Sequence, residues 1–242
     1  MVKILLNGYK GRMGRAIIAA SENSGCEIAF KTDMGDKPED FVASADCVVD
    51  FSFRDCTAPL AELCAKHGKP LVIGTTGHSP EQRAQIIECS EKTAIVWAGN
   101  YSLGVNLLNY LVKIAAKYLP AAYNIEIVEM HHNLKKDSPS GTAEKLLDIA
   151  LEARGLSKEN VVHGREGLVG ERPENEIGVH ALRGGSVVGD HSVIFAGKGE
   201  RLELRHIAED RNIFASGVLV AAAWLAGTPA GLYGMEDVLG IK

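Results

Sequence analysis

The segment that decides the fold is Ile4–Gly14, with the sequence ILLNGYKGRMG. It overlaps a mostly apolar run, Val2–Asn7, which is typical of a buried parallel strand. Apolar residues at helical spacing follow in residues 11–22. Between the strand and the helix lies a G-x-x-G-x-x-G turn with its glycines at Gly8, Gly11 and Gly14. Glycines let a backbone approach a pyrophosphate, and the first N–H groups of a helix point at such an anion. The segment therefore predicts a dinucleotide-binding turn, with three close-packed turn glycines as the alternative.

An acidic residue follows at the spacing that such a turn requires. Asp33 lies roughly 20 residues after Gly14, at the end of a second predicted strand, where a carboxylate binds the adenosine ribose. A carboxylate repels the 2′-phosphate of NADPH, and Met34 rather than Arg comes next, which favours NADH. Lys10, Arg12 and Lys31 could still supply positive charge, so NADPH remains open.

The rest of the first hundred residues alternates between strand and helix patterns. We expect strands at Glu27–Lys31, Cys47–Phe51, Pro70–Gly74 and Thr93–Trp97, with helices at Leu60–His67 and Pro80–Lys92. This rhythm predicts a parallel sheet with helices on both faces. Loops at the carboxyl ends of such strands line the ligand crevice. Gly74–Gly77 and Ala98–Ser102 are two of these loops, although Gly74–Gly77 could also be a simple turn.

The middle of the chain has a different pattern. A helix at Val105–Tyr118 precedes five predicted strands, at Asn124–His131, Asn160–Arg165, Ile177–Arg183, His191–Ala196 and Arg201–Ala208. They predict a mixed or antiparallel sheet in a second, α+β domain. The tail Phe214–Leu225 is apolar nearly all round, so we expect a buried helix that packs back on the first domain. The fold class is thus a Rossmann-like doubly wound α/β domain plus an α+β domain, with junctions near residues 101 and 212.

Titratable and hydrogen-bonding side chains are most concentrated in Glu129–Ala143, EMHHNLKKDSPSGTA, a segment that follows a predicted strand and leads into a predicted helix. Ser140, Gly141 and Thr142 are at the predicted helix N-terminus, a ready anion site. His131, His132 and Lys135 precede it and add donors, cations and a group that exchanges a proton near neutral pH. We expect a small polyanion here. A metal ion is disfavoured, because adjacent strand residues face opposite ways; a polar loop with a capped helix is the other alternative.

Composition excludes several classes of protein. The 242 residues include 26 basic and 31 acidic side chains, a net charge of −5, and 46% are hydrophobic. These values suit a globular protein and argue against a general nucleic-acid binder. No apolar run reaches the roughly 18 residues of a membrane span, and the N-terminal run is short for a secretory signal. Five cysteines without a C-x-x-C pair predict reduced thiols in a cytoplasmic protein.

These motifs together resemble the dihydrodipicolinate reductase (4-hydroxy-tetrahydrodipicolinate reductase) family of lysine and diaminopimelate biosynthesis. The resemblance covers nearly the whole chain. It is carried by Gly8–Gly14, Asp50–Ser52, Gly74–Gly77, Asn100–Ser102, Glu129–Ala143, Arg165–Arg172 and Arg183–His191.

The resemblance implies a role for each matching residue. His131 corresponds to the catalytic proton donor, and Lys135 to a second catalytic residue that also holds a substrate carboxylate. The substrate-binding set corresponds to His132, Ser140, Gly141 and Thr142. The cofactor segment corresponds to Gly8, Lys10, Gly11, Arg12, Met13 and Asp33, and the nicotinamide contacts to Gly74, Thr76, Ala98 and Tyr101. No metal is implied.

It further implies NADH- or NADPH-dependent reduction of a small cyclic dicarboxylate, dihydrodipicolinate, to tetrahydrodipicolinate. Residues 1–101 and 212–242 would bind the dinucleotide, and residues 102–211 would bind substrate and form a homotetramer. Two alternatives stay open: another two-domain nicotinamide-dependent amino-acid dehydrogenase, such as an aspartate or homoserine dehydrogenase, and a non-catalytic nucleotide sensor.

Overall fold

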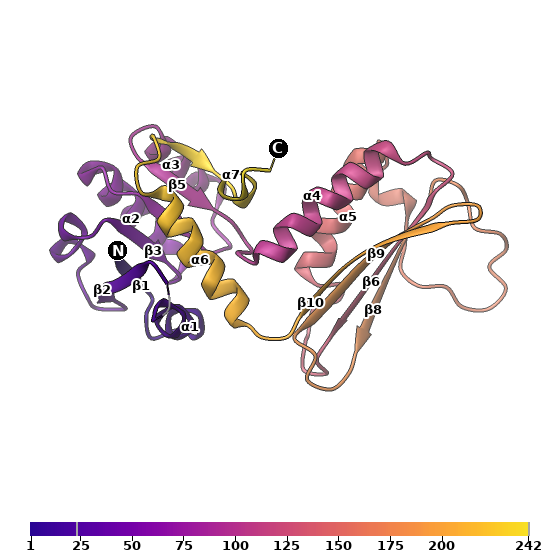
Figure 1. Ribbon diagram of the computed structural model, residues 1–242, viewed down its shortest axis with the longest axis horizontal. Helices are drawn as coiled ribbons and strands as arrows, with labels where there is room; N and C mark the ends of the chain where they lie inside the picture. Colours follow the sequence, from indigo (N-terminus) through magenta and orange to yellow (C-terminus); the bar gives the residue numbers. More distant parts are fainter. Residues whose placement is uncertain (23, 242) are drawn as a thin grey trace. The chain divides into compact units, whose positions relative to one another are not determined.

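The computed structural model describes residues 1–22 and 24–241. The chain forms two compact units, one of Met1–Leu103 with Arg211–Lys242 and the other of Gly104–Asp210 (Figure 1). Among the described residues, no helix combines the length and apolar character needed to cross a membrane.

The first unit is built on a parallel sheet of six strands in the order β11-β5-β4-β3-β1-β2. The strands are β1 (Val2–Asn7), β2 (Cys26–Thr32), β3 (Cys47–Asp50), β4 (Leu71–Ile73), β5 (Ala94–Trp97) and β11 (Gly231–Tyr233). The chain runs from β1 outward to β2 and then returns to β3 on the other side of β1. The strand order therefore reverses between β1 and β3, the position at which such sheets bind ligands.

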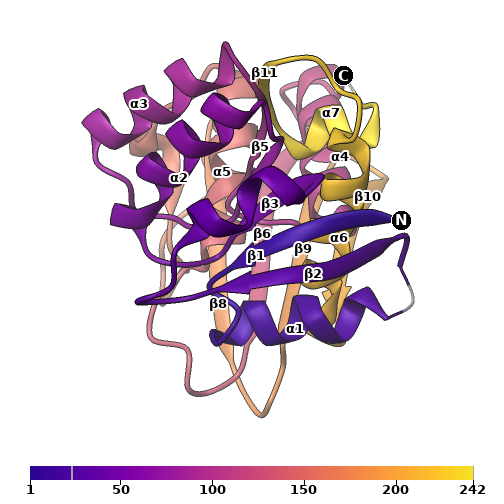
Figure 2. The same cartoon turned by 90° about the vertical axis from the view of Figure 1, so that its left-hand side faces the viewer.

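Helices cover both faces of this sheet. They are α1 (Arg12–Ser21), α2 (Arg54–His67), α3 (Pro80–Ser90), α6 (Asn212–Leu225) and α7 (Met235–Leu239), with short 3₁₀ turns η1 (Pro38–Asp40) and η2 (Val42–Ser44). Ile4 and Leu6 of β1 pack with α1 and α6, whereas Leu5 packs with α2 and α3. Figure 2 shows α2 and α3 on the side of the sheet opposite α1. Burial on both faces explains why Ile4, Leu5 and Leu6 of β1 are apolar without alternation.

The second unit contains a mixed sheet of five strands in the order β10-β9-β6-β8-β7. The strands are β6 (Asn124–His131), β7 (Val161–Val162), β8 (Ile177–Arg183), β9 (Gly189–Ala196) and β10 (Arg201–Ala208). β6 runs parallel to β8 and antiparallel to β9. Helices α4 (Leu103–Tyr118) and α5 (Gly141–Arg154) bury one face around Ile127 and Phe195, and a 3₁₀ turn, η3 (Lys158–Asn160), leads into β7.

Strand β6 positions the chemistry of the second unit. Its burial alternates strictly, so Ile125, Ile127, Glu129 and His131 all lie on the face that α4 and α5 cover. The first two belong to the apolar core. The last two continue the same row as polar groups at the carboxyl end of the strand. The covered face of β6 therefore contributes apolar side chains to the core at its start and polar side chains to the candidate site at its end.

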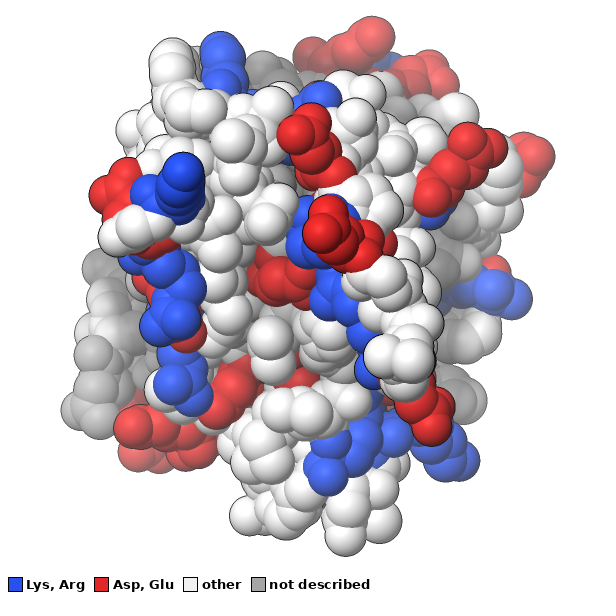
Figure 3. Space-filling model, turned by 90° about the vertical axis from the view of Figure 1, so that its right-hand side faces the viewer, with Lys and Arg blue, Asp and Glu red and all other residues white. Residues whose placement is uncertain are grey.

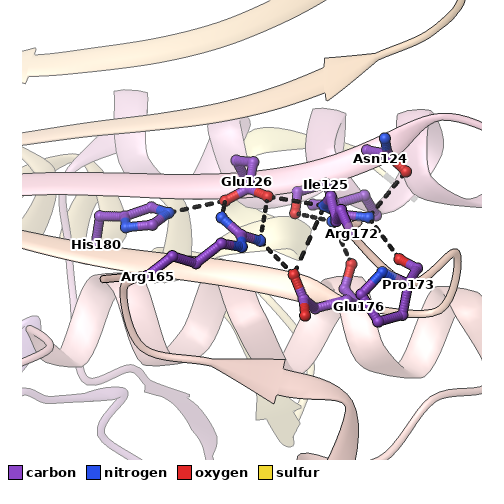
Figure 4. A network of polar contacts seen from close by, with 8 residues as sticks. All are labelled: Asn124, Ile125, Glu126, Arg165, Arg172, Pro173, Glu176 and His180. Carbon is purple, nitrogen blue, oxygen red and sulfur yellow. Dashed lines mark hydrogen bonds and ion pairs between the residues drawn. The ribbon is translucent and has the colours of Figure 1, made fainter. Parts of the chain in front are cut away.

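The opposite face of β6 carries an ion-pair network (Figure 4). Glu126 Oε1 accepts from Arg165 Nη2 at 2.8 Å and from Arg172 Nε at 3.0 Å, and its Oε2 lies 2.8 Å from His180 Nε2. Arg165 also pairs with Glu176. The network ties the segment between β7 and β8 to the sheet, so these two arginines have structural partners.

The predicted fold class is confirmed, and the bounds of β1, β6, β8 and β10 match the predicted ones. The predicted strand Asn160–Arg165 was wrong in extent, because β7 ends at Val162 and Gly164 has a positive φ of 78°. Helix α2 begins at Arg54 rather than Leu60, since the polar residues before Pro59 gave no apolar period. The short elements β11 and α7 were not predicted.

Candidate active site

The glycine turn of the first unit is sterically closed to side chains at two positions. Gly8 has a φ of +88°, and a Cβ there would lie 2.3 Å from the carbonyl oxygen of Phe51. A Cβ on Gly14 would lie 2.3 Å from the oxygen of Gly8. Gly11 is looser, with only that oxygen at 3.2 Å, and it is the N-cap of α1. The turn thus brings backbone close to any ligand at the start of α1.

Asp33 follows β2 at the carboxyl edge of the sheet, beside this turn. Its Oδ2 accepts the N–H of Lys10 at 2.9 Å, and its Oδ1 accepts the N–H of Met34 at 2.9 Å. These two bonds, that of Lys10 first, hold the pKa of Asp33 below its ordinary value. The carboxylate is therefore ionised at neutral pH and keeps further lone pairs for a ligand.

Two adjoining cavities of about 710 and 730 Å³ follow the carboxyl edge of this sheet and share Gly11 and residues 51–53. The charged side chains lining the first cavity are all acidic: Asp33, Asp36, Glu39 and Asp55. Arg12 and Arg54 line the second. A groove with carboxylates at one end, a glycine turn in the middle and arginines beyond it fits a nicotinamide dinucleotide, whose pyrophosphate needs the positive charge.

Only some of the predicted cofactor residues line the two cavities. Gly74, Thr76 and Met13 line the second cavity. Lys10 and Ala98 line neither cavity. Tyr101 is 2% exposed, and its hydroxyl donates to the carbonyl of Ile73 at 2.7 Å. The Tyr101 side chain therefore holds the ends of β4 and β5 together, and Tyr101 lines neither cavity.

The second unit contains a buried carboxylate, Glu129, with several partners. Its Oε2 lies 2.6 Å from His131 Nδ1, and its Oε1 accepts the N–H of Ser140 at 3.1 Å. Arg183 donates to both oxygens at 2.9 Å. Burial alone would raise the pKa of Glu129, yet these hydrogen bonds lower it overall. The ionised carboxylate makes His131 carry its proton on Nδ1, so that Nε2 is the atom left for exchange with a ligand.

A second histidine completes this cluster. His191, on β9, is the register partner of Glu129, and its Nε2 lies 2.9 Å from the hydroxyl of Ser140. Its ring meets that of His131 edge to face, with centroids 5.1 Å apart. Burial, reinforced by His131, lowers the pKa of His191 to about 4, so it is neutral at physiological pH.

The anion site that the sequence predicts would lie at the start of α5. Ser140 is the N-cap, and its side chain accepts the N–H of Ala143 at 3.2 Å. Gly141 is exposed, and a Cβ there would meet nothing within 4 Å. Lys135 is mostly buried, with Nζ 2.8 Å from Asp137 Oδ2, and the His132 backbone N–H bonds to Val187. The helix N-terminus can therefore receive an anion, and Glu129 fixes His131 beside it.

The sequence reasoning singled out neither Glu129 nor His191 as a functional residue. The signal for Glu129 was present, because it falls on the buried side of the alternating strand β6. The signal for His191 was weaker, since its pairing with Glu129 depends on the register between β9 and β6. Within the described part of the chain, no group of three or more His, Cys, Asp or Glu side chains could hold a metal ion.

The Rossmann-like groove and the buried carboxylate–imidazole pair together define a two-domain, nicotinamide-dependent oxidoreductase. Family models described as the N-terminus and the C-terminus of dihydrodipicolinate reductase match residues 2–101 and 104–239. The chain belongs to the dihydrodipicolinate reductase family.

Relatives of known name agree with this placement, and a solved structure shares the fold. The chain is 49% identical over 244 residues to the 4-hydroxy-tetrahydrodipicolinate reductase of Akkermansia muciniphila, covering 100% of this chain and 99% of that one. It is 47% identical over 252 residues to that of Caulobacter vibrioides, covering 100% and 98%. A dipicolinate-bound dihydrodipicolinate reductase from Paenisporosarcina sp. TG-14 shares the fold, with a TM-score of 0.80, 24% identity and 97% coverage of each chain.

Proposed function

We propose that this chain reduces dihydrodipicolinate, formed from 4-hydroxy-tetrahydrodipicolinate, to tetrahydrodipicolinate with NADH or NADPH. One hydride and one proton are added to the ring, and the nucleotide leaves oxidised. The observation that carries the proposal is the Glu129–His131 pair, whose carboxylate also bonds the N-cap of α5. A proton donor and an anion site are thereby held on one buried group.

Each of the two units would bind a different reactant. Residues 1–101 and 212–242 would bind the dinucleotide in the groove of the first unit, and residues 102–211 would bind the dicarboxylate. When bound, the nicotinamide supplies the hydride. Gly8, Gly11, Arg12 and Met13 would receive the pyrophosphate, Asp33 the ribose, and Gly74 and Thr76 the nicotinamide end.

The substrate carboxylates would be held by a cation and a helix dipole. We assign one carboxylate to the first N–H groups of α5, at Gly141 and Thr142, and to Lys135. Breaking the pair with Asp137 costs Lys135 little, because the Asp137 carboxylate is mostly exposed to solvent, and pairs at the surface contribute roughly 0–1 kcal/mol. His132 and Ser140 would complete the pocket, and the relative that binds dipicolinate supports a dicarboxylate of this size.

His131 would deliver the proton. Hydride addition builds negative charge on the ring, and an imidazolium beside it can neutralise that charge. The Glu129 carboxylate accepts a hydrogen bond from Nδ1 of the ring and so leaves Nε2 as the atom that can donate to the substrate. Arg183 keeps Glu129 ionised and in place.

The acidic end of the groove supports NADH as the preferred nucleotide. Asp33, Asp36, Glu39 and Asp55 line the cavity that would hold the adenosine, and no basic side chain lines it among the described residues. A 2′-phosphate placed there would face several negative charges with no cation to pair with.

The second sheet supports a homotetramer. Its face away from α4 and α5 carries Val128, Met130, Leu182, Ile194 and Ile207, which are half-buried or exposed. Viewed from the side of this unit, uncharged surface extends between rows of charged side chains (Figure 3). Pairing such faces between copies would bury apolar area. The proposed setting is the cytoplasm.

A coupled assay tests the function. Dihydrodipicolinate synthase would generate the substrate, and oxidation of NADH and NADPH would be followed side by side. His131→Ala should lower kcat by orders of magnitude and leave the Kd for NADH within about twofold. Unchanged turnover in this variant would remove the assignment of His131.

A further inference from the structure

A fully buried carboxylate, Asp50, lies at the carboxyl end of β3 in the first unit. Its register partner on β1 is Asn7, so both side chains lie where the strand order reverses. Asp50 lines neither cavity, but three residues that bond to it do: Asn7 lines the first, Thr75 the second, and Ser52 both. The Asp50 side chain is therefore buried directly behind residues that line the groove.

Four neutral groups donate hydrogen bonds to this carboxylate. Oδ1 accepts from Asn7 Nδ2 at 2.9 Å and Ser52 Oγ at 2.5 Å, and Oδ2 accepts from Thr57 Oγ1 at 2.7 Å and Thr75 Oγ1 at 3.0 Å. The Thr75 hydroxyl itself accepts the N–H of Ser52 at 3.0 Å, so its hydrogen is directed to Asp50. Donors on both oxygens suit an ionised carboxylate, which is an acceptor only.

Asp50 differs from buried Glu129 and half-buried Glu126 in having no ion-pair partner within the part of the chain that the structure describes. Glu126 and Glu129 each pair with arginine. In the described residues, no Lys, Arg or His side chain forms an ion pair with Asp50. Arg54 lines the groove, but half of its side chain is exposed, so solvent screens its charge. The field of Asp50 therefore acts on the groove above it.

The field reaches the loop that follows β4. Burial lowers the pKa of His78, and the negative charge of Asp50 opposes that shift. Gly74, Thr76 and Gly77, just before His78, line the second cavity. These residues belong to the end of the groove assigned above to the nicotinamide.

We propose that the negative charge of Asp50 makes the groove bind the oxidised nucleotide more tightly, relative to the reduced one, than it otherwise would. The same charge would assist hydride donation. In that step the C4–H bond of the reduced ring breaks, its electron pair leaves with the hydrogen to the substrate, and the neutral ring becomes a cation. A fixed negative charge beneath the ring stabilises the positive charge that develops. The inference rests on the proposed function, since it requires a nicotinamide nucleotide in this groove.

The test is to titrate the full-length protein with NADH and with NAD⁺, in the absence of substrate, for the wild type and Asp50→Asn. The new amide can donate to Thr57 and Thr75, because hydroxyls also accept, so the fold is retained. The variant should weaken NAD⁺ binding about tenfold more than NADH binding. An equal effect on both nucleotides, with the fold intact by circular dichroism, overturns the inference.

Two matched variants separate charge from packing. Asp46→Asn removes an exposed carboxylate at the opposite, amino-terminal end of β3 and should leave the affinity ratio unchanged. Thr57→Val removes one donor but keeps the Asp50 charge, so the ratio should stay within about twofold. A shift with Thr57→Val as large as that with Asp50→Asn would contradict the electrostatic role.

The wild type alone provides a second readout. A benzamide analogue of NAD⁺ has carbon in place of the charged ring nitrogen and is otherwise nearly isosteric. It should bind about tenfold more weakly than NAD⁺, and equal binding would refute the inference. If the wild type binds neither NADH nor NAD⁺, the proposed function itself fails; if it binds both with a ratio independent of Asp50, only the inference does.

Discussion

Glu129 and His131 are two residues apart on β6 and face the same side, with Oε2 and Nδ1 2.6 Å apart. Because successive strand residues point to opposite faces, this i, i+2 spacing is what brings the two side chains together. The other carboxylate oxygen accepts the N–H of Ser140 and so joins the imidazole to the start of α5. One carboxylate thus positions both halves of the candidate substrate site.

The first prediction concerns this carboxylate. Glu129→Gln should lower kcat about 100-fold, because the protonated imidazole loses its counter-charge, while the Kd for NADH stays within about twofold. Steady-state kinetics and a nucleotide titration measure the two quantities. Glu152→Gln, at an exposed position late in α5, is the control and should behave like the wild type. A kcat unchanged in Glu129→Gln would rule out the role of the pair.

The second prediction compares neighbouring lysines. Lys135→Ala should lower kcat/KM for the dicarboxylate about 100-fold, the effect expected from losing a charge-assisted contact in the transition state. Lys136→Ala, which removes the exposed lysine next in the chain, should change it less than twofold. Equal losses in both variants would mean that general positive charge, rather than Lys135, attracts the substrate.

The third prediction concerns nucleotide choice. Asp33→Ala should raise the Kd for NADH about tenfold, since the ribose loses a charged acceptor, and should raise that for NADPH less. Asp40→Ala, in η1 and outside both cavities, is the matched control. Fluorescence titration with each nucleotide gives the ratio. Equal weakening of both nucleotides would refute the ribose assignment.

Much of this architecture follows from local patterns in the chain. β1 could be predicted because burial on both faces leaves its centre, Ile4–Leu6, continuously apolar. α5 could be predicted because Ser140 is a typical N-cap before an amphipathic period. β11 could not, since its three residues include a glycine and take their strand conformation from pairing with β5.

The candidate site was only partly predictable, for a related reason. His131, Lys135 and Ser140 fall in one continuous motif. His191 and Arg183 come from β9 and β8, and they join the site through the register of each strand with β6. Asp50 is similar: its partners Asn7, Thr57 and Thr75 come from three separate segments. Contacts of this kind depend on tertiary structure, which no local pattern encodes.

The fourth prediction concerns stability in acid. The pKa of His191 is lowered to about 4 in the folded protein, against roughly 6.5 when unfolded, so below pH 6.5 the unfolded state binds a proton that the folded state does not. The contribution of His191 to the unfolding free energy is complete above pH 6.5 and is lost progressively as the pH falls toward 4. Between pH 7.5 and pH 5 it should cost about 2 kcal/mol of unfolding free energy.

Urea unfolding at the two pH values measures this loss. His191→Gln can still bond to Ser140 but does not titrate, so its loss between pH 7.5 and pH 5 should be smaller by that amount. Identical pH dependence in the two proteins would show that His191 is not held neutral by the fold.

The fifth prediction concerns packing in the first unit. A Cβ on Gly217 of α6 would lie 1.7 Å from the carbonyl oxygen of Tyr101, so Gly217→Ala must displace the helix. Overpacking of this kind costs about 2 kcal/mol, which should lower Tm by about 5 °C. Gly99→Ala, where a Cβ meets nothing within 4 Å, is the control for calorimetry. Equal Tm values for the two variants would contradict the close packing.

The most direct test of the account is a crystal structure of the protein with NADH and pyridine-2,6-dicarboxylate. We expect one carboxylate within hydrogen-bond distance of the Gly141 and Thr142 N–H groups and of Lys135 Nζ, with His131 Nε2 facing the ring. A dicarboxylate bound in the second unit away from the start of α5 and from His131 would contradict it.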